Sequence, residues 1–175
     1  MISSQALDEP VPGKQRMKLL ADQRRPRFAR WIAAGFGTGF APLAAGTVAS
    51  AVATLVGAGL LWTSPWLLLV GALLATFGGW WAVRAAHVEG DPGWVVIDEF
   101  AGQWIALLGL ARVTPLGLLA AFLLFRIFDI TKLGPVGWAD RQHSAVGVML
   151  DDVIAGAAAA LVLVVVRWFW PDALL

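Results

Sequence analysis

Carboxylates recur in the second half of the chain, each group beside apolar sequence. Asp98 and Glu99 form one pair, Asp151 and Asp152 form another, and Asp129 lies between the pairs. A charged side chain within apolar membrane sequence costs about 2.5 to 3.5 kcal/mol, so a compensating charge is expected. Oxygen ligands favour a hard cation, most naturally Mg²⁺ with waters and a substrate phosphate. We therefore predict that these five residues are both the metal ligands and the catalytic carboxylates.

Basic residues accompany the carboxylates. Arg126, Asp129 and Lys132 recur at three-residue spacing, which places them close to one face of a continuous helix. Two cations that flank a carboxylate suit an anionic head group, so Arg126 and Lys132 are predicted to bind phosphate, with Arg141 as a weaker candidate. The alternative is that Arg126 and Lys132 only anchor the cytoplasmic end of a helix.

A glycine-rich segment from Gly35 to Thr47 is a further candidate for phosphate binding, because it offers backbone N–H groups and the Thr47 hydroxyl close to a helix start. Asp151 and Asp152 also have a structural interpretation, as caps at the start of a helix. Neither His87 nor His143 is expected to be essential, since isolated loop histidines are usually only solvated.

The composition is that of an integral membrane protein. Hydrophobic residues make up 59% of the 175 residues, charged residues make up 14%, and residues 31 to 83 carry no charge at all. That run exceeds the roughly 20 residues needed for one crossing. The absence of cysteine excludes disulfides and thiolate metal sites. A formal net charge of +1 argues against nucleic-acid binding.

The apolar segments predict an all-α, polytopic membrane helical bundle with about five transmembrane helices. Proline at position 65 ends the first apolar arm, since proline cannot continue a helix. Residues 1–30 form a basic, proline-containing tail, and residues 31–175 form the membrane-embedded catalytic domain. The segment 35–46 is expected to be a loop or a short interfacial piece. The expected arms are residues 47–62, 66–83, 94–111, 114–128 and 153–170.

The distribution of basic residues predicts the orientation. With five crossings, 11 of the 13 basic residues fall on the side of the amino terminus, and only Arg112 and Arg167 fall on the other. Because cytoplasmic loops are enriched in lysine and arginine, the amino terminus is expected to be cytoplasmic. The five carboxylates then lie near the cytoplasmic surface of the membrane.

Several motifs, taken in order, resemble the phosphatidylglycerophosphatase A family. They are Gly37 to Thr47, Val96-Ile-Asp-Glu-Phe-Ala-Gly-Gln-Trp-Ile105, Phe125-Arg-Ile-Phe-Asp-Ile-Thr-Lys132, Asp140-Arg141 and Gly147-Val-Met-Leu-Asp-Asp-Val-Ile-Ala-Gly156. Departures lie in loops, at Ala45, Leu133-Gly134-Pro135 and Ser144-Ala145. The acidic residues are unaffected, so the departures bear on loop geometry and substrate preference.

The resemblance implies a bacterial inner-membrane, magnesium-dependent lipid phosphatase that converts phosphatidylglycerophosphate to phosphatidylglycerol and phosphate. A water activated by the metal and an aspartyl-phosphate intermediate both remain open as routes. Two other classes compete: a small ion- or proton-coupled transporter that uses intramembrane carboxylates, and a noncatalytic membrane subunit. A transporter should place its charges near the midplane, whereas these carboxylates cluster at one face. The oligomeric state is left open.

Overall fold

The computed structural model describes residues 26–88, 92–142 and 144–172. The regular secondary structure of this part of the chain is all helical, with seven α-helices and one 3₁₀ helix. The all-α prediction is therefore confirmed. Most of the predicted tail, residues 1–25, lies outside the described residues, and so does His143.

The first two predicted arms form a helical hairpin, α3 (Ala45–Thr63) and α4 (Pro65–Ala85). Between them, the Ser64 hydroxyl accepts a hydrogen bond from the Trp66 N–H at 3.2 Å, and Pro65 occupies the first position of α4. Proline is favoured there because its missing N–H would have no partner in the helix. The hairpin prediction is confirmed, with each arm extended by one or two residues at its ends.

Two short helices precede the hairpin, α2 (Arg27–Ala33) and the 3₁₀ helix η2 (Gly35–Phe40). The segment 35–46 is therefore partly helical, although η2 contains a kink where Phe36 and Gly37 adopt positive φ angles of 56° and 103°. A β-carbon added at Gly39 would lie 2.0 Å from the carbonyl oxygen of Trp94. The glycine lets the segment pack directly on the backbone that leads into α5.

Helix α5 (Ile97–Leu107) is shorter than the predicted arm 94–111. Val96 precedes the helix with φ −148° and ψ 16°, and its N–H donates to the carbonyl oxygen of Ala33 at 2.9 Å, which holds the chain against α2. At about 1.5 Å per residue, 11 residues extend about 17 Å, roughly half the thickness of a bilayer core. Helices α6 (Pro115–Thr131) and α7 (Pro135–Asp140) follow.

The last helix, α8 (Ala145–Phe169), begins eight residues before the predicted arm 153–170. Ser144 caps it, accepting a hydrogen bond from the Gly147 N–H at 3.2 Å. Asp151 and Asp152 therefore lie about two turns inside α8. The interpretation of these two residues as caps of the helix start is wrong, because the serine fills that role.

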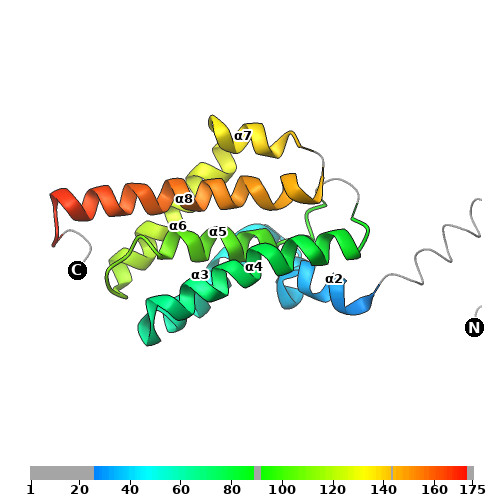
Figure 1. The fold of residues 1–175 in the computed structure, drawn as a ribbon, viewed down its shortest axis with the longest axis horizontal. Helices are drawn as coiled ribbons and strands as arrows, with labels where there is room; N and C mark the ends of the chain where they lie inside the picture. Colours follow the sequence, from blue (N-terminus) through cyan, green and yellow to red (C-terminus); the bar gives the residue numbers. More distant parts are fainter. Residues whose placement is uncertain (1–25, 89–91, 143, 173–175) are drawn as a thin grey trace, which may run out of the picture.

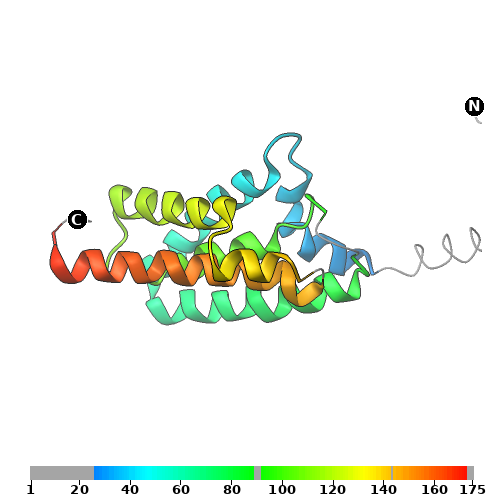
Figure 2. The same ribbon diagram turned by 90° about the horizontal axis from the view of Figure 1, so that it is seen from above.

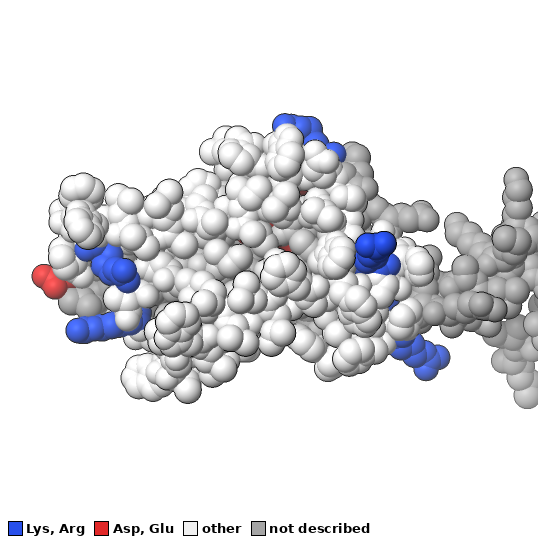
Figure 3. Space-filling view, in the orientation of Figure 1, with Lys and Arg blue, Asp and Glu red and all other residues white. Residues whose placement is uncertain are grey.

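The long helices run along the long axis of the molecule, as Figures 1 and 2 show, and α5 contacts α3, α4, α6 and α8. Three helices of the described chain, α3, α4 and α8, are long and apolar enough to cross a membrane. In the view of Figure 3, lysine and arginine lie toward the two ends, and the surface between them is almost free of charge. This surface fits a lipid environment. The count of five crossings stays a prediction.

Candidate active site

A cavity of about 130 Å³ brings together the five predicted carboxylates. They come from three helices: Asp98 and Glu99 from the first turn of α5, Asp129 from the last turn of α6, and Asp151 and Asp152 from α8. Each is at most 9% exposed. Lys132, Gly46, Gly93, Val95 and Val96 complete the lining. Residues separated by more than 50 positions in the chain thus share one small polar space.

Three of these carboxylates are close enough to share one cation. Glu99, Asp129 and Asp152 each offer an oxygen atom, and the three oxygens lie within 4.8 Å of one another. One member of each acidic pair therefore belongs to the cluster, as expected from the roughly 100° rotation between neighbouring helical residues. Three carboxylate oxygens are donors that suit a hard divalent cation.

Glu99 is fixed by contacts from two neighbouring helices. Its Oε2 atom accepts a hydrogen bond from the Ser50 hydroxyl of α3 at 2.6 Å and lies 2.7 Å from Nη1 of Arg126 in α6. Gly46 leaves the room that the carboxylate needs, because an added β-carbon would lie 2.2 Å from Glu99 Oε1. The glycine-rich segment thus reaches the site through Gly46.

Arg126 and Lys132 both contact Asp129, but the helix does not continue through all three residues as the spacing assumed. Helix α6 ends at Thr131, and Lys132 follows it with a left-handed φ of 49°. Arg126 Nη1 lies 2.6 Å from Asp129 Oδ2, and Lys132 Nζ lies 3.4 Å from Asp129 Oδ1. Lys132 also pairs with Asp151 and lies 3.2 Å from Asp140 Oδ1. Burial opposes its charged form, yet the hydrogen bond to Asp151 and the surrounding carboxylates raise the pKa of Lys132 above its ordinary value. It is a cation throughout the neutral pH range.

The charges of this cluster do not balance. Five buried carboxylates face two cations, Arg126 and Lys132, which leaves a formal charge of −3 if all are ionised. Buried charges are stable only when they are paired or coordinate a metal. An anionic substrate would increase the imbalance. The residues therefore fit a divalent cation, by the chemistry of the donors and by their charge.

Three of the four predicted phosphate-binding residues lie outside the cavity lining, namely Arg126, Thr47 and Arg141. Arg126 still contacts two carboxylates of the lining, Glu99 and Asp129. Thr47 is exposed in the first turn of α3, and Arg141 is exposed directly after α7.

Two polar residues near the site, Ser50 and Gln103, were not identified from the sequence. Ser50 follows Gly46 by one helical turn, a spacing that could have identified it. Gln103 follows Glu99 by one turn and is fully buried, and its amide has no hydrogen-bond partner within the described part of the chain.

The sequence comparisons relate the chain to a known family. A family model described as phosphatidylglycerophosphatase A matches residues 31–167, which includes every carboxylate of the cavity. The chain belongs to the phosphatidylglycerophosphatase A family. It is a homologue of phosphatidylglycerophosphatase A, a phosphoric monoester hydrolase. The family resemblance that the motifs indicate is therefore confirmed.

Curated relatives cover most of the chain. A phosphatidylglycerophosphatase A of Escherichia coli is 37% identical over 80% of this chain and 84% of its own, and that of Haemophilus influenzae is 33% identical over 79% and 88%. A Bacteroides thetaiotaomicron protein named "Putative phosphatidylinositol-3-phosphatase" is 38% identical over 83% of this chain and 98% of its own. No solved structure matches the chain significantly.

Proposed function

We propose that the chain hydrolyses phosphatidylglycerophosphate to phosphatidylglycerol and inorganic phosphate, that it requires Mg²⁺, and that it acts at the cytoplasmic face of the bacterial inner membrane. Family membership supports the reaction class. The observation that carries the proposal is the buried cluster of Glu99, Asp129 and Asp152, whose oxygens are within reach of one cation.

The cavity residues divide into two roles in this proposal. Glu99, Asp129 and Asp152 hold the metal, with Asp98 and Asp151 beside them in the cavity wall. When bound, Mg²⁺ supplies positive charge that offsets the phosphate oxygens and makes a water more acidic. Lys132 lines the cavity, where its ammonium pairs with Asp129 and Asp151, and it is the cation that we assign to a phosphate oxygen.

Arg126 has a different assignment from that of the sequence analysis. Its Nη1 atom is shared between Glu99 and Asp129, so its guanidinium holds two metal ligands in place. Arg126 does not line the cavity, whereas Lys132 does. We therefore assign Arg126 to positioning of the carboxylates and phosphate binding to Lys132.

The membrane arrangement is part of the proposal. The three helices that can span a membrane and the nearly uncharged surface in Figure 3 support a membrane enzyme. The 11 to 2 distribution of basic residues, counted for five crossings, supports a cytoplasmic amino terminus. The lipid tails remain in the bilayer while the phosphate enters the cavity. Transport is less well supported, because Asp98, Glu99 and Asp129 lie in terminal turns of their helices, and the cluster forms ion pairs with Arg126 and Lys132.

A second candidate substrate is phosphatidylinositol 3-phosphate, favoured by the name of the Bacteroides relative. Both lipids present a phosphate monoester, so the carboxylate cluster does not discriminate between them. The discrimination must come from the loops around the cavity, where this chain departs from the family pattern at Leu133 and Ser144.

The decisive experiment is phosphate release by the purified full-length chain in detergent. Each lipid monoester is supplied separately, with Mg²⁺ or with a chelator. We expect Mg²⁺-dependent release, fastest from phosphatidylglycerophosphate, and loss of release in Asp152→Asn. The same exchange at Asp172, which is exposed after α8, is the matched control. Release that is equally fast without any divalent cation would overturn the metal assignment, and no release from any lipid would overturn the enzyme assignment.

A further inference from the structure

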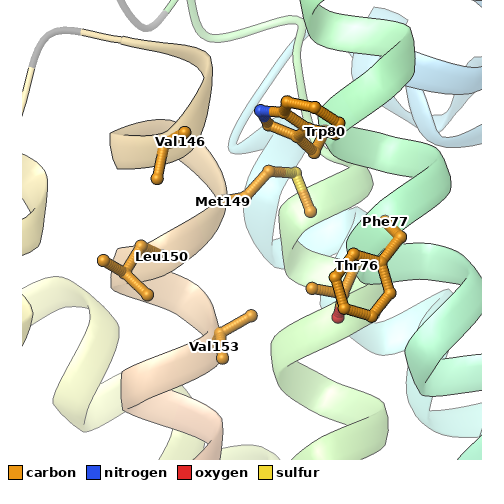
Figure 4. A pocket seen from close by; sticks show the side chains of 7 residues that line it. All are labelled: Thr76, Phe77, Trp80, Val146, Met149, Leu150 and Val153. Atoms are coloured by element: carbon orange, nitrogen blue, oxygen red, sulfur yellow. The ribbon is translucent and has the colours of Figure 1, made fainter.

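An apolar groove of about 310 Å³ separates α4 from α8 (Figure 4). Its volume falls within the range of about 300 to 1,000 Å³ that small-molecule sites occupy. The one hydroxyl in its lining, on Thr76, donates to the Ala72 carbonyl oxygen at 2.8 Å. This hydroxyl proton is therefore already used within α4. The walls come from both helices: Thr76, Phe77 and Trp80 from α4, and Val146, Met149 and Val153 from α8.

The groove has a polar end. Figure 4 shows Trp80 and Val146 at one end of the groove and Val153 at the other. The guanidinium carbon of Arg84 lies 5.7 Å from the centre of the Trp80 ring, so a cation is held at the Trp80 end. Val146 is the second residue of α8, which places the positive end of that helix dipole at the same mouth. Positive charge thus lies at one end of an otherwise apolar groove.

The groove is separate from the acidic cavity. With about 100° per residue, the groove residues Val146, Met149 and Val153 lie on the side of α8 opposite to Asp151 and Asp152 taken together. Met149, which is 3% exposed, packs over Gly79 and closes the floor. A molecule in the groove therefore does not contact the carboxylate cluster.

We propose that this groove binds an anionic phospholipid, with one acyl chain between α4 and α8 and the head-group phosphate at Arg84. Both walls belong to helices that can span a membrane, so the groove opens toward lipid. Phe77 is 65% exposed at its rim, a large apolar surface that an acyl chain would cover. Charge complementarity selects an anionic head group over a zwitterionic one. The proposal depends on membrane residence and does not depend on phosphate hydrolysis.

Native mass spectrometry of the full-length protein, released from detergent, tests this proposal. The probes are dioleoyl phosphatidylserine and dioleoyl phosphatidylcholine, which have the same chains and no phosphate monoester. We expect one retained phosphatidylserine per chain, bound about tenfold more tightly than phosphatidylcholine, which corresponds to about 1.4 kcal/mol. Arg84→Gln should remove the preference, and Val153→Trp, which fills the groove, should weaken retention of both lipids.

Further variants keep the test decisive. Phe77→Ala alters only an exposed side chain and should also weaken retention of both lipids. Arg112→Gln, an exposed arginine in the loop between α5 and α6, should match the wild type. Asp152→Asn should lose phosphatase activity and keep the preference for phosphatidylserine. Equal binding of the two lipids by the wild type, or a preference that survives Arg84→Gln, would overturn the proposal.

Discussion

Gly156 of α8 lies so close to Gly102 of α5 that a β-carbon added at position 156 would be 2.1 Å from the Gly102 carbonyl oxygen. Conversely, a β-carbon at Gly102 would lie 2.5 Å from the carbonyl oxygen of Asp152. Small residues allow helix backbones to approach in this way. The contact sits one turn from both Glu99 and Asp152, so it sets the distance between two members of the carboxylate cluster.

Substitution at this contact should destabilise the protein. Gly156→Ala forces a methyl group against backbone, and we expect a loss of about 1 to 3 kcal/mol of stability, measured by thermal or denaturant unfolding in detergent. Gly78→Ala is the matched control, since a β-carbon at that helical glycine meets nothing within 4 Å. It should be neutral or stabilising by up to about 1 kcal/mol, because alanine is the better helix former. Equal stabilities of the two variants would contradict the close packing.

The sequence predicted the long helices well, because their signal is local. Proline at position 65 and unbroken apolar runs suffice to place α3 and α4 within two residues of their ends. The predicted helix ends were wrong where tertiary contacts determine them. The backbone before α5 is attached to α2 by the hydrogen bond from Val96 to Ala33, and α8 contains two carboxylates that the hydropathy pattern places before the start of the segment.

The candidate site could also be predicted where the signal is local, and not where it depends on tertiary contacts. The carboxylates stood out because charge is costly in apolar sequence, and the structure gathers all five in one cavity. The partners of Arg126 could not be predicted, because its contact with Glu99 joins residues 27 positions apart on two helices. Thr47 looked suitable by its hydroxyl, yet the turn of α3 leaves it exposed and presents Gly46 and Ser50 to Glu99.

Gly46→Ala should reduce activity more than stability. The added β-carbon would lie 2.2 Å from Glu99 Oε1 and would push this carboxylate from its position beside Arg126. Misplacement of a site residue by about 1 Å can cost about 100-fold in rate. We expect a loss of that order in turnover, with a melting temperature close to the wild-type value. Gly59→Ala in the same helix, where nothing lies within 4 Å, should retain full activity.

Arg126→Lys tests whether the guanidinium positions the carboxylates. Lysine keeps the charge, but its side chain is shorter and ends in a single ammonium group, so it cannot place a donor where Nη1 lies between Glu99 and Asp129. We expect turnover to fall by 10- to 100-fold, about 1.4 to 2.8 kcal/mol, and the Mg²⁺ concentration for half-maximal activity to rise. Arg112→Lys is the control at an exposed position. A variant unchanged in both quantities would leave Arg126 as a membrane-interface anchor.

Divalent cations should stabilise the protein even without substrate. A cation that binds only the folded state at about 100 times its dissociation constant adds about 2.7 kcal/mol. Mg²⁺ should therefore raise the melting temperature of the wild type, a chelator should reverse the rise, and Asp152→Asn should respond weakly. Asp172→Asn should behave as the wild type does. A wild-type melting temperature that is insensitive to Mg²⁺ would show that the buried carboxylates are stabilised in another way.

The ion pair of Lys132 with Asp151 predicts how the stability of the protein depends on pH. Because the pKa of Lys132 is raised on folding, its favourable contribution is present in full below the unfolded value of about 10.4 and is lost only as the pH rises through the higher folded value. Stability between pH 6 and 9 should therefore show no loss from deprotonation of this lysine. Lys132→Met leaves Asp151 buried without its cation and should lower the melting temperature across that whole range.

The double variant Lys132→Met with Asp151→Asn separates the role of Lys132 in stability from its role in activity. It should recover part of the lost stability, because the unpaired charge is removed. Its activity should stay low, since the phosphate-binding cation is absent. If Lys132→Met alone is as stable as the wild type at neutral pH, the ion pair contributes nothing to the fold, and if the double variant regains activity, Lys132 does not bind phosphate.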